Sequence, residues 1–345
     1  MPFSKNAWRE LWLLRFVEGR ADDFSRWTHS RRGVVTVGRL RLQRVVYLSL
    51  LILPLAALTT LPTANAQSVT WSNVTSPTSN NLYSVFCVSV SDCWAVGYDA
   101  IVQWNGASWS TVTTPTKSNI YSVFCVSVSD CWAVGHDAII QWNGASWANV
   151  TSPTTSDLWS VFCVGSNDCW AVGNGGSSGA GLILQWNGAS WATVTIPPSN
   201  ALTSVNCVGA SYCLAVGWSG AVLQWDGSSW ANVKSPTSSN LWSAFCVSSS
   251  NCWVVGYSDI TDAGFVTQWN GGSWITVPSP TSNYLDSVFC VSSSDCWAVG
   301  YDFIAQWSGS SWATVTSPAI TFLDSVFCVS SSDCWAVGAG GTIIH

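Results

Sequence analysis

Short apolar runs separated by turn-forming residues recur along most of the chain. One unit contains residues 82–87 (LYSVFC), 93–97 (CWAVG), 101–104 (IVQW) and 109–115 (WSTVTTP). The runs are rich in Val, Trp, Phe and Thr, the segments between them are rich in Gly, Asn, Ser and Pro, and none has helical periodicity. Each run has the length of one β-strand. Four strands in a unit of this size are typical of a β-propeller blade.

Seven copies of this unit fill residues 68–345. Their first cysteines are spaced by 38, 38, 44, 39, 44 and 38 residues, so the repeat length is about 40 residues. In the first copy, Asn105 and Gly106 separate the third and fourth runs, and this pair suits a tight hairpin turn because both residues tolerate positive φ. The sequence therefore predicts an all-β fold: a seven-bladed β-propeller with four antiparallel strands per blade.

The two ends of the repeat region complement each other. The seventh copy stops at His345, which aligns with Gln103 and Gln224 on the third strand, so this copy lacks a fourth strand. Residues 69–77 (VTWSNVTSP) match the fourth-strand segment 109–115. We expect them to close the last blade and remove exposed sheet edges, whereas an open solenoid, the alternative, has no use for this match. Because the chain stops one residue before the third-strand Trp, a fragment of a longer protein is also an option.

The first 66 residues differ from the repeats in charge and hydropathy. Ten of the 12 Lys and Arg residues lie in residues 1–44, and an apolar run follows at residues 45–61. This order, followed by small residues, is typical of a secretory signal peptide, here with cleavage after Ala66. The alternatives are an uncleaved signal anchor, for which a run interrupted by Pro54 is marginal, a downstream translation start, and a twin-arginine signal at residues 30–32.

We therefore expect two parts. Residues 1–66 form a basic region plus signal peptide, or a possible signal anchor, and residues 68–345 form the propeller, which is secreted or at the cell surface. The exported part contains two bases, Lys117 and Lys234, against 14 Asp with no Arg and no Glu, so its net charge is −12. Binding to nucleic acid or anionic lipid depends on Lys and Arg. The composition thus excludes nucleic acid as a partner, and an anionic membrane surface except through an N-terminal anchor.

All 14 cysteines occur as Cys-x5-Cys pairs, one pair per copy. Regularly spaced cysteines in an exported chain indicate a disulfide framework, and the repeat suggests one bridge within each pair, contributing about 2 kcal/mol in the chain-entropy model. Reduced core cysteines are the alternative, and a zinc site is weaker still because the spacing is not that of a zinc knuckle. The pairs are Cys87 with Cys93, Cys125 with Cys131, Cys163 with Cys169, Cys207 with Cys213, Cys246 with Cys252, Cys290 with Cys296, and Cys328 with Cys334.

The hairpin between the third and fourth runs carries a family resemblance. Residues 105–109 (NGASW) resemble the Gly-x-Ser/Thr-Trp end of the Asp-box (BNR) repeat. The wider order of Ala-Val-Gly, a strand, a Gly-containing turn and Trp resembles the Ycf48/HCF136-like photosystem II assembly-factor propellers and other secreted bacterial propellers. This resemblance covers all seven copies and implies a propeller fold. Trp104 and its equivalents replace the Asp of the Asp-box, and no Arg after Arg44 matches the arginine cluster of Asp-box sialidases or the basic patch of Ycf48-like proteins.

Residue types that support catalysis are scarce in the exported part. General acid–base chemistry draws on His, Glu, Asp, Lys or Tyr, but there is no Glu, and His136 occupies a position that is Tyr in three other copies. Paired Asp residues could serve a glycoside hydrolase, yet Asp recurs before the second Cys, which suggests capping of the turn. The recurring acids are Asp92, Asp130, Asp168, Asp295 and Asp333. We therefore predict no catalytic residues, no metal site and no cofactor.

Comparison of the copies separates fixed positions from varying ones. Trp recurs at three positions, which are interpreted as packing between blades. The fixed residues are Trp94, Trp132, Trp170, Trp253, Trp297 and Trp335 on the second strand; Trp104, Trp142, Trp186, Trp225, Trp269 and Trp307 on the third; and Trp71, Trp109, Trp147, Trp191, Trp230, Trp274 and Trp312 on the fourth.

Two varying positions supply the candidate ligand-binding residues. One follows the Gly that ends the second strand, and the other follows the Leu or Ile that opens each copy. Both are expected on the same side of the disc, together with insertions within residues 173–185 and 256–268. The candidates are Tyr83, Tyr98, Tyr121, His136, Trp159, Trp218, Trp242, Tyr257 and Tyr301. Varied aromatic rings suit a glycan- or protein-binding face. The alternative is that these loop residues vary between copies without any binding role, around a packed core.

The sequence as a whole predicts a non-enzymatic extracellular binding propeller. Its ligand is expected to be carbohydrate or a protein at the cell surface. A structural spacer and an Asp-based glycoside hydrolase are the two alternative functions.

Overall fold

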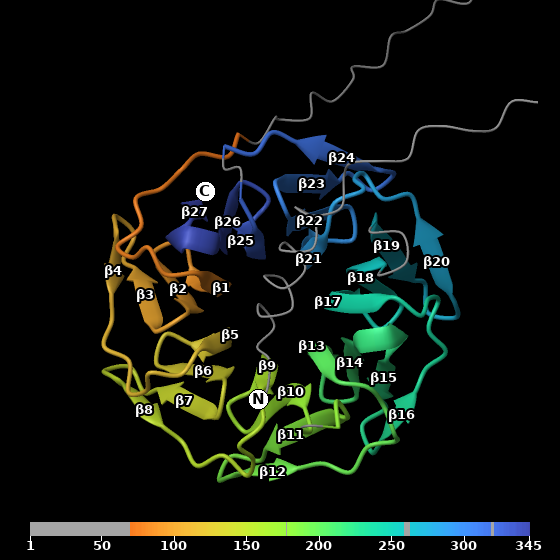
Figure 1. Ribbon diagram of the computed structural model, residues 1–345, viewed down its shortest axis with the longest axis horizontal. Helices are drawn as coiled ribbons and strands as arrows, with labels where there is room; N and C mark the ends of the chain where they lie inside the picture. The colour runs from red at the N-terminus through yellow and green to blue at the C-terminus, as the bar shows by residue number, and fades with distance from the viewer. Residues whose placement is uncertain (1–69, 177, 259–262, 319–320) are drawn as a thin grey trace, which may run out of the picture. The chain divides into compact units, whose positions relative to one another are not determined.

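The repeat region forms a ring of seven antiparallel sheets (Figure 1). The structure is a computed structural model that describes residues 70–345, except residues 177, 259–262 and 319–320; the predicted signal segment, residues 1–66, lies outside the described residues. The only helical segments in the described part are two single turns of 3-10 helix, Trp218–Gly220 and Ala339–Gly341. None of its helices is long and apolar enough to cross a membrane. The predicted seven-bladed propeller is confirmed.

Each blade runs from an innermost strand at the centre of the ring to an outermost strand at the rim (Figure 1). Blade 1 contains β1 (Leu82–Ser89), β2 (Asp92–Gly97), β3 (Ala100–Trp104) and β4 (Trp109–Thr111). Blade 2 contains β5 (Ile120–Ser127), β6 (Asp130–Gly135), β7 (Ala138–Trp142) and β8 (Trp147–Asn149). Blade 3 contains β9 (Leu158–Gly165), β10 (Asp168–Asn174), β11 (Gly181–Trp186) and β12 (Trp191–Thr193). Blade 4 contains β13 (Leu202–Gly209), β14 (Tyr212–Gly217), β15 (Val222–Trp225) and β16 (Trp230–Asn232).

The remaining three blades complete the ring. Blade 5 contains β17 (Asn240–Ser248), β18 (Asn251–Ser258), β19 (Ala263–Trp269) and β20 (Trp274–Val277). Blade 6 contains β21 (Leu285–Ser292), β22 (Asp295–Gly300), β23 (Phe303–Trp307) and β24 (Trp312–Val315). Blade 7 contains β25 (Leu323–Ser330), β26 (Asp333–Gly338) and β27 (Ile343–Ile344). The innermost strands of neighbouring blades contact each other around the whole ring, including β25 with β1.

Disulfides and tight turns fix the register of the strands within a blade. Cys87 pairs with Cys93 across β1 and β2, and all seven predicted bridges are present. In the β3–β4 turn Gly106 has φ 89°, and Asn105 Oδ1 accepts hydrogen bonds from the backbone N–H groups of Ala107 and Ser108 at 3.0 and 2.9 Å. The disulfide framework is confirmed, and seven bridges fit an oxidising compartment.

The Asp that precedes the second cysteine in five of the blades does not cap its turn as predicted. Asp92 Oδ1 instead accepts a hydrogen bond from the side chain of Gln103 on β3, at 3.0 Å. The same Asp–Gln bond recurs in blades 2, 3 and 6. The turn itself is held by Ser89, whose hydroxyl accepts the N–H of Ser91 at 3.3 Å. The Asx-turn interpretation was wrong because Gln103 is the cross-strand partner of Trp94, two residues from Asp92, so the Asp92 and Gln103 side chains lie on the same face of the sheet and meet diagonally.

Apolar side chains pack between blades, with one buried cluster at each of the seven junctions. Between blades 1 and 2, the Trp94 ring lies 4.8 Å from that of Trp142 and 5.3 Å from that of Trp147, the latter edge-on. The same triad recurs at four other junctions. Trp142 also donates its Nε1–H to the Val128 carbonyl at 3.1 Å. These contacts confirm that the fixed Trp residues are scaffold.

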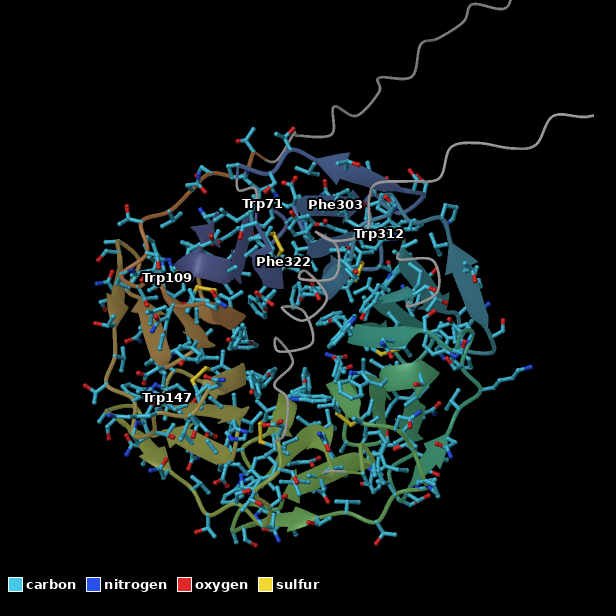
Figure 2. All side chains as sticks on the ribbon, viewed as in Figure 1. Trp71, Trp109, Trp147, Phe303, Trp312 and Phe322 are labelled. Atoms are coloured by element: carbon cyan, nitrogen blue, oxygen red, sulfur yellow. A yellow bond between two sulfur atoms is a disulfide. The ribbon has the colours of Figure 1, made fainter. Side chains whose placement is uncertain are left out.

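The N-terminal segment of the described part closes blade 7. The Ser72 N–H donates to the His345 carbonyl at 2.7 Å, and the His345 N–H donates to the Ser72 carbonyl at 3.0 Å. Trp71 is buried 5.4 Å from Trp297, at the place that Trp109 and Trp147 occupy in blades 1 and 2 (Figure 2). The predicted ring closure is therefore confirmed.

The innermost strands are joined by side chains rather than by backbone pairing. Ser84 Oγ accepts the N–H of Val123 in the next blade at 3.2 Å, and the equivalent bond occurs at all seven junctions. Next along the strand, the Phe86 ring lies 4.6 Å from that of Phe124. Blade 4 has Asn206 in place of this Phe, and its Oδ1 accepts a backbone N–H of blade 5 at 2.9 Å. The serines thus satisfy backbone donors that the sheets leave unpaired.

Candidate functional site

The turns between second and third strands and the connections entering each innermost strand lie on one face of the ring, named here the variable face. The residue that follows the Gly at the end of each second strand is hydrogen-bonded to the segment that leads into the innermost strand of the same blade. Tyr98 N–H donates to the Asn81 carbonyl and His136 N–H to the Asn119 carbonyl, both at 2.9 Å. A Cβ on Gly97 would collide with the Asn81 carbonyl, so this close approach requires glycine. Both varying positions therefore share one face, as predicted.

Four of the nine predicted ligand-binding residues lie at the start of innermost strands and are largely buried. Tyr121, Trp159 and Trp242 are buried, with Trp159 only 2% exposed, and Tyr83 is partly buried. Their rings form part of a packed layer at the inner end of the blades. Whether they contact a ligand stays a prediction.

The structure brings four predicted residues together in one aromatic cluster. This mouth cluster consists of Tyr83, Tyr121, Trp159, Trp218 and Ala201, from blades 1 to 4. The ring centroids of Tyr83 and Tyr121 are 5.8 Å apart, and those of Trp159 and Trp218 are 5.0 Å apart. It is distinct from the seven clusters between blades. The mouth cluster is thus an apolar feature of the variable face beyond the repeated blade packing.

Two further aromatic groups occupy blades 5 to 7. The rings of Trp242 and Tyr257 are nearly parallel, 6.0 Å apart, and Tyr257 meets Tyr284 edge-on at 4.5 Å. Tyr301 packs at 4.5 Å against Phe322, which is labelled in Figure 2. The nine predicted residues are therefore distributed around the ring rather than gathered in one pocket.

His136 is paired with a carboxylate that the sequence analysis did not single out. Its Nδ1 lies 2.6 Å from Oδ1 of Asp157, whose side chain is 2% exposed while that of His136 is 45% exposed. Burial, with the neighbouring negative charge of Asp157 as a smaller cause, raises the pKa of Tyr121 well above its usual value. Tyr121 therefore keeps its phenolic proton at neutral pH. The contact between His136 and Asp157 has a structural explanation, because the buried Asp157 carboxylate requires a hydrogen-bonding partner.

Three turns of the variable face combine an exposed or half-exposed ring with an exposed acid. These aromatic–acidic turns are Tyr98-Asp99, His136-Asp137 and Tyr301-Asp302. The acids adopt left-handed backbone conformations, with φ of 47°, 50° and 51° respectively, which Asp tolerates better than most residues. Tyr98 is 54% exposed and Tyr301 is 40% exposed, the highest values among Phe, Tyr and Trp in the described residues.

A third varying position on this face escaped the sequence analysis. It lies just before the Leu or Ile that opens each copy, and its residues are Asn81, Asn119, Asp157, Ala201, Asn240, Tyr284 and Phe322. These side chains meet the turn of the preceding blade, as in the contacts of His136 with Asp157 and of Tyr257 with Tyr284. The variation of this residue between copies could have identified the position from the sequence. The comparison of copies began at the following Leu or Ile and therefore did not include it.

The described residues contain no group of three or more His, Cys, Asp or Glu that could hold a metal ion. The opposite face carries the seven disulfides and the turns between third and fourth strands, in which the same Asn side-chain bond recurs in blades 1, 2 and 3. The variable face therefore holds the sequence differences that could distinguish a ligand.

Comparison with known proteins supports the architecture. No family model and no curated protein matches the chain. Among solved structures it is similar to Ycf48 bound to a D1 peptide, with 15% identity, a TM-score of 0.65, and coverage of 79% of this chain and 95% of that one. It is also similar to Ycf48 from Cyanidioschyzon merolae, with 18% identity, a TM-score of 0.61, and coverage of 80% and 98%. The WD40 propeller domain of Doa1 gives 14% identity, a TM-score of 0.65, and coverage of 79% and 96%. At these identities the likeness establishes the fold alone.

Proposed function

We propose that this chain is an exported, non-catalytic binding propeller that holds a partner protein on its variable face. One observation carries the proposal: the two most exposed Phe, Tyr or Trp rings of the described residues, Tyr98 and Tyr301, both lie at the same varying position of that face. In a chain with 25 Trp, where nearly all large rings pack inside, two exposed rings at one repeat position favour a contact surface.

Two further observations support this function. The mouth cluster adds apolar side chains that vary between blades and do not serve the repeated blade packing. One structure of similar fold is described as Ycf48 bound to a D1 peptide, so a propeller of this kind can hold a peptide. Export is supported by the seven disulfides and by the composition of residues 1–66. Carbohydrate is the alternative ligand, because exposed rings also stack on sugars.

The test applies peptide and glycan arrays to the same labelled protein. The double variant Tyr98→Ala/Tyr301→Ala removes the exposed rings. The matched control is Val90→Ser/Val128→Ser, which removes two side chains that are 59% and 60% exposed on the disulfide face, where blades 3, 5, 6 and 7 carry Ser.

Peptide signals that persist in the control and disappear in the tyrosine variant would support the proposal. Signals confined to glycans would establish the carbohydrate alternative instead. If the wild type binds neither array, or if the tyrosine variant binds as the wild type does, the proposed function is wrong and a structural spacer becomes the better account.

A further inference from the structure

The aromatic–acidic turns combine two features that together recognise positive charge. A ring attracts a cation to its face, and a carboxylate beside it forms an ion pair with the same group. Tyr98 with Asp99 and Tyr301 with Asp302 repeat this arrangement at equivalent positions of blades 1 and 6. An acid alone would be an ordinary solvated surface residue, but an acid adjacent to one of the two most exposed large rings is a feature of its own.

The turns occupy neighbouring parts of the ring. Blade 6 contacts blade 7 through β21 and β25, blade 7 contacts blade 1 through β25 and β1, and blade 1 contacts blade 2 through β1 and β5. The intervening turn of blade 7, Ala339–Gly341, carries neither a ring nor a charge. Its small side chains allow a bound backbone to approach closely between the charged turns. The three turns thus form one arc, named here the acidic arc.

Acids outnumber bases on this face, where Lys117 and Lys234 lie in the connections that enter β5 and β17. The described residues contain two exposed bases, Lys117 and Lys234, and no Arg, whereas the acidic arc alone presents three exposed Asp carboxylates. Asp157, Asp286 and Asp324 add further acids at the starts of blades 3, 6 and 7. On the opposite face the recurring Asp residues are engaged with Gln side chains within their own blades. These Gln bonds leave the Asp charges in place, so the distinguishing feature of the acidic arc is that its carboxylates directly follow exposed or half-exposed rings.

We infer that the acidic arc binds a Lys- or Arg-rich polypeptide segment, with cationic side chains over the rings of Tyr98 and Tyr301 and paired with Asp99, Asp137 and Asp302. This inference rests on the proposed function and names its partner class. A basic polypeptide fits better than a neutral sugar, because a sugar hydroxyl can donate a hydrogen bond to the carboxylates of Asp99, Asp137 and Asp302 but cannot neutralise their charge. A nucleic acid or an anionic lipid would be repelled by the same carboxylates.

The test uses fluorescence anisotropy with the full chain and two labelled probes, a Gly-Lys repeat peptide and a Gly-Glu repeat peptide. The variant is Asp99→Asn/Asp137→Asn/Asp302→Asn, and Asn keeps the side-chain shape and the tolerance of positive φ. The control is a triple variant of equal charge on the disulfide face: Asp92→Asn, Asp295→Asn and Asp226→Asn.

The control substitutions preserve local geometry because the chain already contains them. In blade 5, Asn251 occupies the position of Asp92, and its Oδ1 accepts a hydrogen bond from the Gln268 side chain at 3.0 Å. In blade 1, Asn105 occupies the position of Asp226. Both triple variants remove three negative charges, so non-specific attraction of the Lys probe falls equally in both. Thermal unfolding and Trp fluorescence check that each variant is folded.

We expect the Lys probe to bind the wild type more weakly as salt rises, and the Glu probe not to bind. The acidic-arc variant should lose about tenfold in affinity, against less than about threefold for the control. Equal losses in the two variants, or no binding of the Lys probe to the wild type, would overturn the inference. If uncharged array peptides still bind and lose their signal in Tyr98→Ala/Tyr301→Ala, the proposed function survives that failure.

Discussion

Ring closure through the N-terminal segment makes a specific prediction about Trp71. This residue occupies the same place in blade 7 as Trp147 does in blade 2, and each ring meets a second-strand Trp edge-on, at 5.4 and 5.3 Å. Both are buried, at 6% and 5% exposure. Replacing a buried Trp by Ala costs about 3–5 kcal/mol. Trp71→Ala and Trp147→Ala should therefore lower the free energy of unfolding by similar amounts.

The two variants should differ in where the loss is felt. Trp147 lies on a strand that directly follows the other three strands of its blade in the sequence. Residues 70–77, in contrast, are joined to blade 7 only by non-covalent contacts, among them the backbone hydrogen bonds of Ser72 with His345. A loss of about 3–5 kcal/mol confined to this segment raises its opening equilibrium by about a hundredfold or more. Trp71→Ala should expose residues 70–77 and the amide of His345 without unfolding the other blades.

Hydrogen exchange followed by mass spectrometry measures this difference segment by segment. We expect fast exchange of residues 70–77 in Trp71→Ala and wild-type protection of the same residues in Trp147→Ala. The reasoning would be refuted if residues 70–77 stayed protected in Trp71→Ala, or if both variants exposed them equally. Continued protection would mean that contacts other than the buried indole hold the closing strand, and equal exposure would mean that the loss is not local to that strand.

Three further predictions follow from local contacts. Replacing both Cys163 and Cys169 by Ser should lower stability by about 2 kcal/mol, measured by calorimetry, and should not prevent folding; alkylation of the unreduced wild type should add no mass. Because burial raises the pKa of Tyr121 above the ordinary tyrosine value of 10.0, the unfolded state loses that phenolic proton first, so stability falls as pH rises above about 10. Tyr121→Phe should reduce this fall in unfolding curves, and an unchanged fall would contradict the prediction. Gly135→Ala should destabilise by about 2 kcal/mol or more, because its Cβ would strike a backbone carbonyl, whereas Gly165→Ala has open space and should change the melting temperature little.

The scaffold was predictable because it is repeated. Each strand, turn and cysteine pair is specified by residues within about 40 positions, and seven copies reveal which residues each blade requires. The match between residues 69–77 and a fourth strand even predicted the closure with His345, a contact between the two ends of the propeller region. The role of the recurring Asp92 was predicted wrongly, because a sequence does not show whether a side chain turns towards its own loop or towards the adjacent strand.

The candidate site was predictable only in part. Comparison of the copies placed both varying positions on one face, as the structure shows, but it grouped Tyr98 and Trp159 together, although Tyr98 is 54% exposed and Trp159 is 2% exposed. It also missed Asp157, which contacts His136 across a blade junction. Exposure at such junctions depends on what the neighbouring blade presents, and the neighbour is encoded about 40 residues away.

The sequence by itself determined the fold, the disulfide pairing and the face on which variation lies, because these follow from local patterns repeated in every copy. Tertiary structure alone decided which varied residues are available to a partner. Ring closure and blade packing bury Tyr121 and Trp242 and leave the Tyr98-Asp99 and Tyr301-Asp302 turns in solvent. The physical reason is that burial is a property of the junction between two blades, whereas a repeat specifies each blade separately.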